Sequence, residues 1–149
     1  MKDHITVKMK FGVILVLMVL CFVTRALAVV DDAHTYALEA GAPYVKKGFV
    51  VREEHWAGSL SRNEQSSIAA QLFKGNEYWF WLSSDEDDAR VTVHVYDSAG
   101  KLVDAEAWQR GKSAGVRVLP KSTGTFFIVF KVTETKLKRT RWAVAYAYK

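Results

Sequence analysis

Two hydrophobic periods divide the chain. Between residues 31 and 47, apolar side chains recur at the spacing of one helical face, namely Ala33, Tyr36, Ala37, Ala40 and Tyr44. An aspartate, Asp31 or Asp32, precedes this stripe and provides a capping carboxylate for the start of a helix. Gly41 and Pro43 interrupt the pattern, so we expect the helix to end near Ala40 or to restart at Pro43.

From residue 49 onward the period changes to two, which is typical of half-buried β-strands. Between residues 91 and 96, three valines alternate with a threonine, a histidine and a tyrosine. Turn sequences rich in Gly, Asn, Asp, Ser and Pro separate the segments. The predicted strands are residues 49–60, 66–73, 77–83, 90–96, 102–108, 115–119, 125–133 and 141–148. About eight short strands at this spacing indicate an all-β fold, an antiparallel β-sandwich of jelly-roll type.

Three predicted strands are apolar on both faces, so each needs a cover on its second face besides the core between the sheets. They are residues 77–83, 125–133 and 141–148. The predicted helix can cover the small alanine face of residues 141–148. Alternatively, Trp79 and Trp81, together with Trp108, form an open aromatic platform that contacts a sugar or a peptide. A homodimer face is the third interpretation.

Residues 1–28 have the three parts of an export signal. Residues 1–10 are a basic start, residues 11–23 are apolar and uncharged, and Ala26 and Ala28 are the small residues before the cleavage position. The apolar run is shorter than the ~20 residues that a spanning helix needs. We therefore expect a cleaved bacterial signal peptide and no permanent membrane span. An uncleaved anchor and a lipoprotein modified at Cys21 are the alternatives.

The net charge and the cysteine content of the chain are different when residues 1–28 are left out of the count. The full chain of 149 residues has a formal charge of +5, but residues 1–28 hold four of the 21 basic residues and one of the 16 acidic ones. The remainder has 17 basic and 15 acidic residues, or +2, which removes the compositional support for nucleic-acid binding. It also lacks cysteine, which excludes a disulfide or a cysteine-based zinc site there. We expect residues 29–47 to pack as a helical segment on a sandwich domain of residues 48–149.

Four consecutive carboxylates, Asp85, Glu86, Asp87 and Asp88, fall in a predicted loop between two strands. Clustered carboxylates repel one another, and calcium, which prefers oxygen ligands, relieves that repulsion. The spacing differs from that of an EF-hand, in which ligands alternate and a glycine makes the turn. The sequence therefore leaves two interpretations open, a calcium site or an acidic loop that is only solvated.

Glu53 and His55 would share one face of the predicted strand 49–60. A carboxylate beside an imidazole is a candidate acid–base pair for a hydrolase. Charges on an edge strand that discourage aggregation are the alternative. The sequence has no nucleophile elbow and no glycine-rich phosphate loop.

Three stretches resemble the bacterial pre-peptidase C-terminal domain, a small β-sandwich usually attached to secreted proteases. They are residues 73–78 (FKGNEY), 89–102 (ARVTVHVYDSAGKL) and 120–127 (PKSTGTFF). The resemblance implies a non-catalytic accessory domain that binds matrix or substrate, in some cases with calcium. Since no peptidase precedes these stretches in the sequence, we expect any partner to act in trans.

Taken together, these observations predict an exported, non-catalytic binding or accessory module of the bacterial cell envelope, periplasmic or secreted. Its expected partner is an envelope or extracellular protein or a glycan, with no cofactor apart from the calcium considered above. A structural or protein-interaction domain without a small ligand is the first alternative. A hydrolase that uses Glu53 and His55 is the second.

Overall fold

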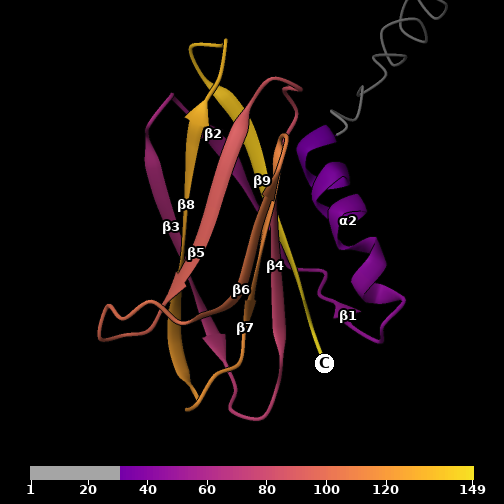
Figure 1. The fold of residues 1–149 in the computed structure, drawn as a ribbon, viewed down its shortest axis with the longest axis vertical. Coiled ribbons are helices and arrows are strands. Elements are labelled where there is room, and N and C mark those ends of the chain that lie inside the picture. The colour runs from indigo at the N-terminus through magenta and orange to yellow at the C-terminus, as the bar shows by residue number, and fades with distance from the viewer. Residues whose placement is uncertain (1–30) are drawn as a thin grey trace, which may run out of the picture. The chain divides into compact units, whose positions relative to one another are not determined.

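Two antiparallel sheets and one helix make up the part of the chain that the computed structural model describes, residues 31–149 (Figure 1). The predicted signal peptide, residues 1–28, lies outside the described residues. The elements are α2 (Asp32–Val45), β1 (Val50–Val51), β2 (Trp56–Leu60), β3 (Gln65–Leu72), β4 (Tyr78–Ser84), β5 (Arg90–Tyr96), β6 (Asp104–Arg110), β7 (Ser113–Val118), β8 (Gly124–Glu134) and β9 (Thr140–Tyr148).

The larger sheet has the strand order β1-β9-β4-β7-β6, and β2 also pairs with β9. The smaller sheet has the order β3-β8-β5. All pairings are antiparallel. The all-β sandwich predicted from the period of two is confirmed, and most predicted strands lie within one or two residues of those observed.

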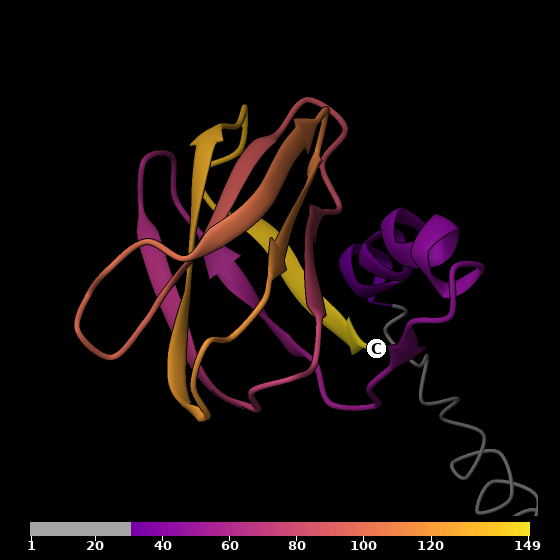
Figure 2. The same ribbon diagram turned by 60° about the horizontal axis from the view of Figure 1, so that its bottom comes forward.

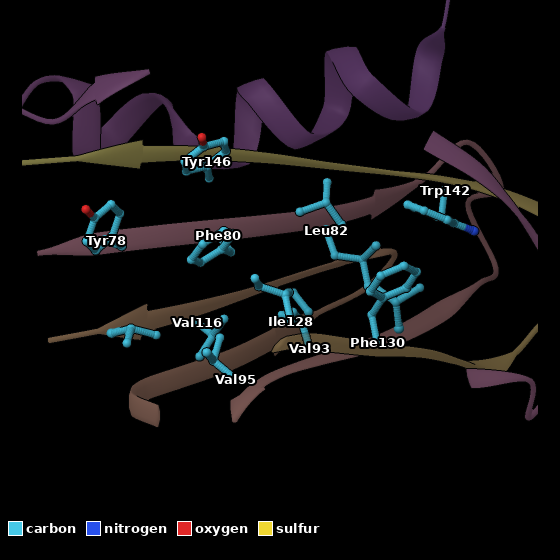
Figure 3. Packing of buried hydrophobic residues seen from close by; sticks show 14 of the residues in the cluster. Tyr78, Phe80, Leu82, Val93, Val95, Val116, Ile128, Phe130, Trp142 and Tyr146 are labelled. Carbon is cyan, nitrogen blue, oxygen red and sulfur yellow. The ribbon is translucent and has the colours of Figure 1, made fainter. Parts of the chain in front are cut away.

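The core between the sheets takes alternate residues from strands of both sheets (Figure 3). On β4, Tyr78, Phe80 and Leu82 point into it, and on β8 Phe126, Ile128 and Phe130 do the same. The three valines of β5 are all buried, while the residues between them are partly exposed. Period-two burial of this kind is what fixes the register of a strand whose one face is in the core.

Helix α2 covers the second face of the larger sheet, beside β4 and β9 (Figures 1 and 2). Ala37, Ala40 and Tyr44 of the helix stripe pack against a second apolar cluster. That cluster contains Phe49, Trp79, Trp81, Ala145 and Ala147. The interpretation in which the helix covers the alanine face is therefore confirmed. The open platform is wrong for Trp79 and Trp81, which are 2% and 0% exposed.

The helix begins as predicted but does not stop where predicted. The Asp31 side chain accepts a hydrogen bond from the backbone N–H of His34, as an N-terminal cap does. The expectation of an end near Ala40 or a restart at Pro43 is wrong, because the helix continues through Pro43 to Val45. Pro43 lies in the last turn, where a missing backbone N–H removes a single hydrogen bond.

The predicted strand 49–60 is also wrong. Residues 52–55 form a loop between two short strands, β1 and β2, which both pair with β9. Gly48, with a φ of 95°, turns the chain sharply after the helix, a conformation that favours glycine. The charged run of residues 52–55 lies at the exposed break between the two pairings.

Helix α2 lies close to the ring of Trp81 at Gly41. An added Cβ there would lie 2.6 Å from ring carbons of Trp81, so Gly41→Ala forces the helix away from the sheet. Alanine favours a helix by about 1 kcal/mol over glycine, whereas overpacking a core typically costs about 1–3 kcal/mol. We expect a net loss of about 1 kcal/mol in the free energy of unfolding, measured by urea denaturation.

The matched control is Gly124→Ala, since an added Cβ at Gly124 meets nothing within 4 Å. That variant should change the unfolding free energy by less than about 0.5 kcal/mol. If Gly41→Ala is more stable than the natural protein, the helix does not depend on close contact with Trp81.

Candidate functional site

A groove of about 530 Å³ runs between helix α2 and the β6–β7 hairpin. We call it the α2 groove. Its lining is aromatic and basic, with one carboxylate. It consists of Tyr36, Glu39, Ala40, Pro43, Tyr44, Lys47, Trp108, Arg110, Lys112 and Ser113.

Each cation of the groove lies over an aromatic ring of the same groove. The Lys112 Nζ is 3.4 Å from the ring centroid of Tyr36. The Arg110 guanidinium is 5.3 Å from the centroid of Trp108, and the Lys47 Nζ is 5.5 Å from that of Tyr44. Such pairs hold a cation at an aromatic surface without neutralising its charge.

Trp108 is fixed in the wall of the groove by two contacts. Its Nε1–H donates a hydrogen bond of 2.9 Å to the Tyr44 hydroxyl. Its indole lies over Gly115 of β7, where an added Cβ would come within 2.5 Å of the ring. The glycine therefore allows the indole to lie flat on the sheet, so that Trp108 stays half-buried and contributes to the surface of the groove.

Lys112 is held as a cation. Burial alone would lower its pKa, but the hydrogen bond and the charge of Asp87, with a smaller contribution from Tyr36, raise the pKa above its ordinary value. The Nζ lies 2.6 Å from Asp87 Oδ1. Lys112 therefore stays protonated at neutral pH, and its charge is paired with that of Asp87.

This geometry corrects the list of expected contact residues. Of the three predicted tryptophans, only Trp108 lines the groove. The sequence pattern had placed Tyr36 and Tyr44 on the helix stripe, but it gave no sign that β6 and β7 would bring Arg110 and Lys112 beside them. That juxtaposition depends on how the helix lies across the sheet.

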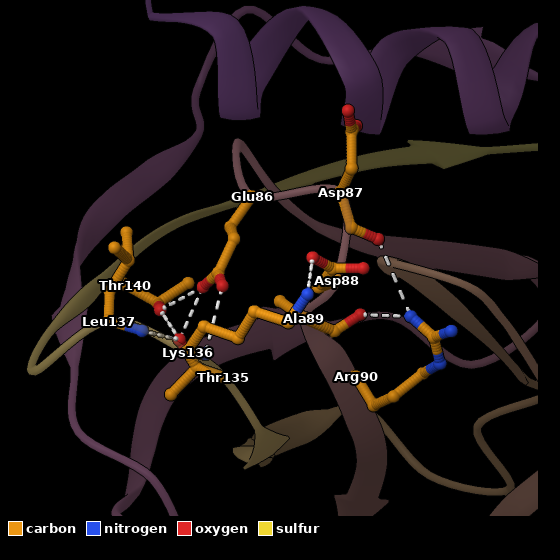
Figure 4. A network of polar contacts seen from close by, with 9 residues as sticks. All are labelled: Glu86, Asp87, Asp88, Ala89, Arg90, Thr135, Lys136, Leu137 and Thr140. Carbon is orange, nitrogen blue, oxygen red and sulfur yellow. Dashed lines mark hydrogen bonds and ion pairs between the residues drawn. The ribbon is translucent and has the colours of Figure 1, made fainter.

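The acidic loop of residues 85–88 connects β4 and β5, and each of its carboxylates has a different set of partners; those of Glu86 and Asp88 are drawn in Figure 4. Asp85 pairs with Arg141 at 2.6 Å, Asp87 with Lys112 at 2.6 Å, and Asp88 with Lys136. The loop is thereby tied to the β6–β7 turn on one side, and to β9 and the β8–β9 connection on the other.

Glu86 accepts the largest set of hydrogen bonds in this loop. Its donors are the hydroxyls of Thr135 and Thr140 and the backbone N–H of Lys136. Burial alone would raise the pKa of Glu86, but these hydrogen bonds together lower it below its ordinary value. Glu86 therefore stays ionised at neutral pH and holds together the two loops that it joins.

Calcium binding by Asp85, Glu86, Asp87 and Asp88 gains no support from this arrangement. Within residues 31–149, no three His, Asp or Glu side chains are grouped so that they could hold a metal ion. A calcium ion would have to displace the cations and hydroxyls that these carboxylates already contact. Calcium binding at this loop therefore stays a prediction of the sequence alone.

Glu53 and His55 do not form the pair expected for a hydrolase. Both residues lie in the loop between β1 and β2, and the His55 Nδ1 contacts the backbone oxygen of Glu53 at 3.3 Å, not its carboxylate. The His55 ring instead stacks on His34 of helix α2, with ring centroids 3.7 Å apart. The strand that would have placed Glu53 and His55 on one face is absent from the described residues.

Comparison with known proteins adds information about the fold. No family model matches this chain, and no curated protein matches it by sequence. Among solved structures, a mitogen from Yersinia pseudotuberculosis matches at a TM-score of 0.50 and 11% identity, over 66% of this chain and 86% of that one. The likeness is one of fold.

Two further structures match less closely. A periplasmic inhibitor of g-type lysozyme from Aeromonas hydrophila has a TM-score of 0.44 and 10% identity, over 69% of this chain and 90% of the inhibitor. The pre-peptidase C-terminal domain of a Bacillus anthracis collagenase has a TM-score of 0.44 and 9% identity, over 62% of this chain and 87% of that domain. A pre-peptidase C-terminal domain is thus among the solved structures to which this chain is similar in fold.

The Glu86 network predicts an acid-sensitive contribution to stability. Because the folded-state pKa of Glu86 is lowered, its stabilisation is present above the unfolded-state pKa and is lost as the pH falls through the folded-state pKa. We expect Glu86→Gln to lower the unfolding free energy at pH 7 by about 1 kcal/mol, since the charge-assisted bonds are weakened. This difference should shrink below about pH 4, as measured by urea denaturation across pH.

The control is Glu53→Gln, because no hydrogen bond or ion pair to the Glu53 carboxylate occurs in the described part of the chain. It should leave the unfolding free energy unchanged at both pH values. A Glu86→Gln difference that does not vary with pH would contradict an ionised Glu86 as the source of the stabilisation.

Calcium gives a separate test of the acidic loop. Since each carboxylate already has a partner within the protein, we expect calcium to leave the melting temperature unchanged. A rise that disappears in the double variant Asp87→Asn, Asp88→Asn, and persists in Glu53→Gln, would establish a calcium site and contradict this expectation.

Proposed function

We propose that this chain is an exported, non-catalytic binding module of the bacterial cell envelope, periplasmic or secreted, whose ligand is an anionic glycan held in the α2 groove. The observation that carries the proposal is the set of three cation–aromatic pairs in one groove. Export rests on the sequence of residues 1–28.

Both parts of the groove suit such a ligand. The rings of Tyr36, Tyr44 and Trp108 contribute apolar surface to the lining, against which the C–H groups of a sugar can pack. Lys47 and Arg110 are exposed at the groove and offer charge-assisted hydrogen bonds to carboxylates. Glu39 is the one carboxylate in the lining, and Asp87 beside the groove pairs with Lys112. Among the described residues Lys47 and Arg110 have no ion-pair partner, so the groove favours anions.

The absence of catalysis is part of the proposal. It is supported by the lack of nucleophile motifs in the sequence and by the separation of the Glu53 carboxylate from the His55 ring. In the part of the chain that the structure covers, no helix is long and apolar enough to span a membrane.

Isothermal titration calorimetry with two polysaccharides tests the proposal. Polygalacturonate is carboxylated, and dextran is neutral. Polygalacturonate should bind with an affinity that falls as salt is added, and dextran should bind far more weakly. Arg110→Glu should weaken polygalacturonate binding about tenfold or more, because it replaces an attractive charge in the groove with a repulsive one.

Lys138→Glu is the matched control, since it makes the same charge change at an exposed residue outside the groove. Equal losses in Arg110→Glu and Lys138→Glu would indicate general charge attraction and contradict the assignment of the site. Binding of polyglutamate without binding of polygalacturonate would identify an acidic peptide as the ligand and contradict the glycan.

A further inference from the structure

The smaller sheet has an outer face that nothing in residues 31–149 covers. Helix α2 lies on the larger sheet, and in Figure 2 strands β3 and β8 lie on the side away from it. On this outer face Phe127 of β8 is 38% exposed, and it is paired in register with Ala69 of β3 and Tyr96 of β5. The second cover expected for β8 is therefore missing within the described chain.

Strand β3 is one edge of that sheet, and β5 is the other. The eight residues of β3, QSSIAAQL, include neither a charged residue nor a proline. Natural edge strands are usually protected by such residues, because an unpaired row of backbone N–H and C=O groups recruits another strand. Phe73, directly after β3, is 53% exposed and enlarges the apolar surface at this edge.

We propose that two copies of this chain pair through β3, antiparallel and about a two-fold axis, so that their smaller sheets join into one continuous sheet. In antiparallel pairing, the sequence numbers of two residues that face each other always add up to the same sum. The two-fold axis exchanges the two strands, so equivalent pairs must be of the same type. Since hydrogen-bonded and non-hydrogen-bonded pairs alternate along an antiparallel ladder, this sum must be even, and one residue lies opposite its own copy.

The register centred on Ala69 fits the sequence. It places Ala69 opposite its own copy, Ile68 opposite Ala70, and Ser67 opposite Gln71. Small side chains meet at the centre, the two polar side chains face each other, and the apolar row that contains Phe127 continues across the axis.

Charge at the two ends of β3 selects this register over its neighbour. Centring on Ala69 brings Glu64, just before the strand, opposite Lys74 of the other copy at both ends. Centring on Ile68 instead removes this ion pair, because it brings Glu64 opposite Leu72. The edge is thus complementary to its own copy, which is the reason for choosing a second copy as the occupant.

Sedimentation velocity of the purified protein between about 1 and 100 μM tests the pairing. The natural protein should dimerise in this range. Ala69→Lys places two like charges at the centre and should weaken dimerisation at least about tenfold. Ala69 is exposed, so the melting temperature should not fall enough to unfold the domain.

The matched control is Ala107→Lys, which makes the same change at an exposed alanine of β6, the edge strand of the other sheet. It should leave dimerisation unchanged.

Lys74→Glu should weaken the dimer by opposing two carboxylates at each end, and adding Glu64→Lys should restore it. A monomeric natural protein, or a dimer that survives Ala69→Lys, overturns the proposal. Failure of the double exchange to restore the dimer overturns the register.

Discussion

The contact between helix α2 and the two buried tryptophans of β4 is the constraint on which the rest of the domain depends. Trp79 and Trp81 project from the face of the larger sheet opposite the core, and a sheet with these side chains in water would expose a large apolar surface. Small residues allow the helix to cover this face. Gly41 lets the helix lie directly on Trp81, and the alanines of β9 leave room for the helix because their side chains are short. The same close approach places the helix stripe beside β6 and β7.

The α2 groove is a by-product of that packing. Tyr36 and Tyr44 reach past the covered tryptophans to the hairpin, where Trp108 donates a hydrogen bond to Tyr44. The groove is formed by a helix, a sheet and the indole of Trp108 lying on Gly115, and not by long loops. It is therefore preorganised, so the protein loses little conformational entropy when the groove is occupied.

The sequence predicted the sandwich because the period of two along β3 to β9 reports directly on which residues reach the core. It also predicted that the helix would cover the alanine face of β9, since small residues allow close approach. It failed for residues 49–60, where a charged loop separates two short strands that pair with the same neighbour. It could not place the α2 groove, because Lys47 and Arg110 are brought together by the angle of the helix on the sheet, and periodicity carries no information about that angle.

Strand β9 has a further consequence, for the order in which the domain assembles. It is the last strand of the domain in chain order, yet it pairs with β1, β2 and β4 and so occupies the interior of the larger sheet. Until residues 140–148 have left the ribosome, β1 and β2 lack a partner, and β4 lacks one of its two neighbours. The nascent chain therefore lacks its central sheet until these residues have emerged, so the domain cannot complete its fold before then.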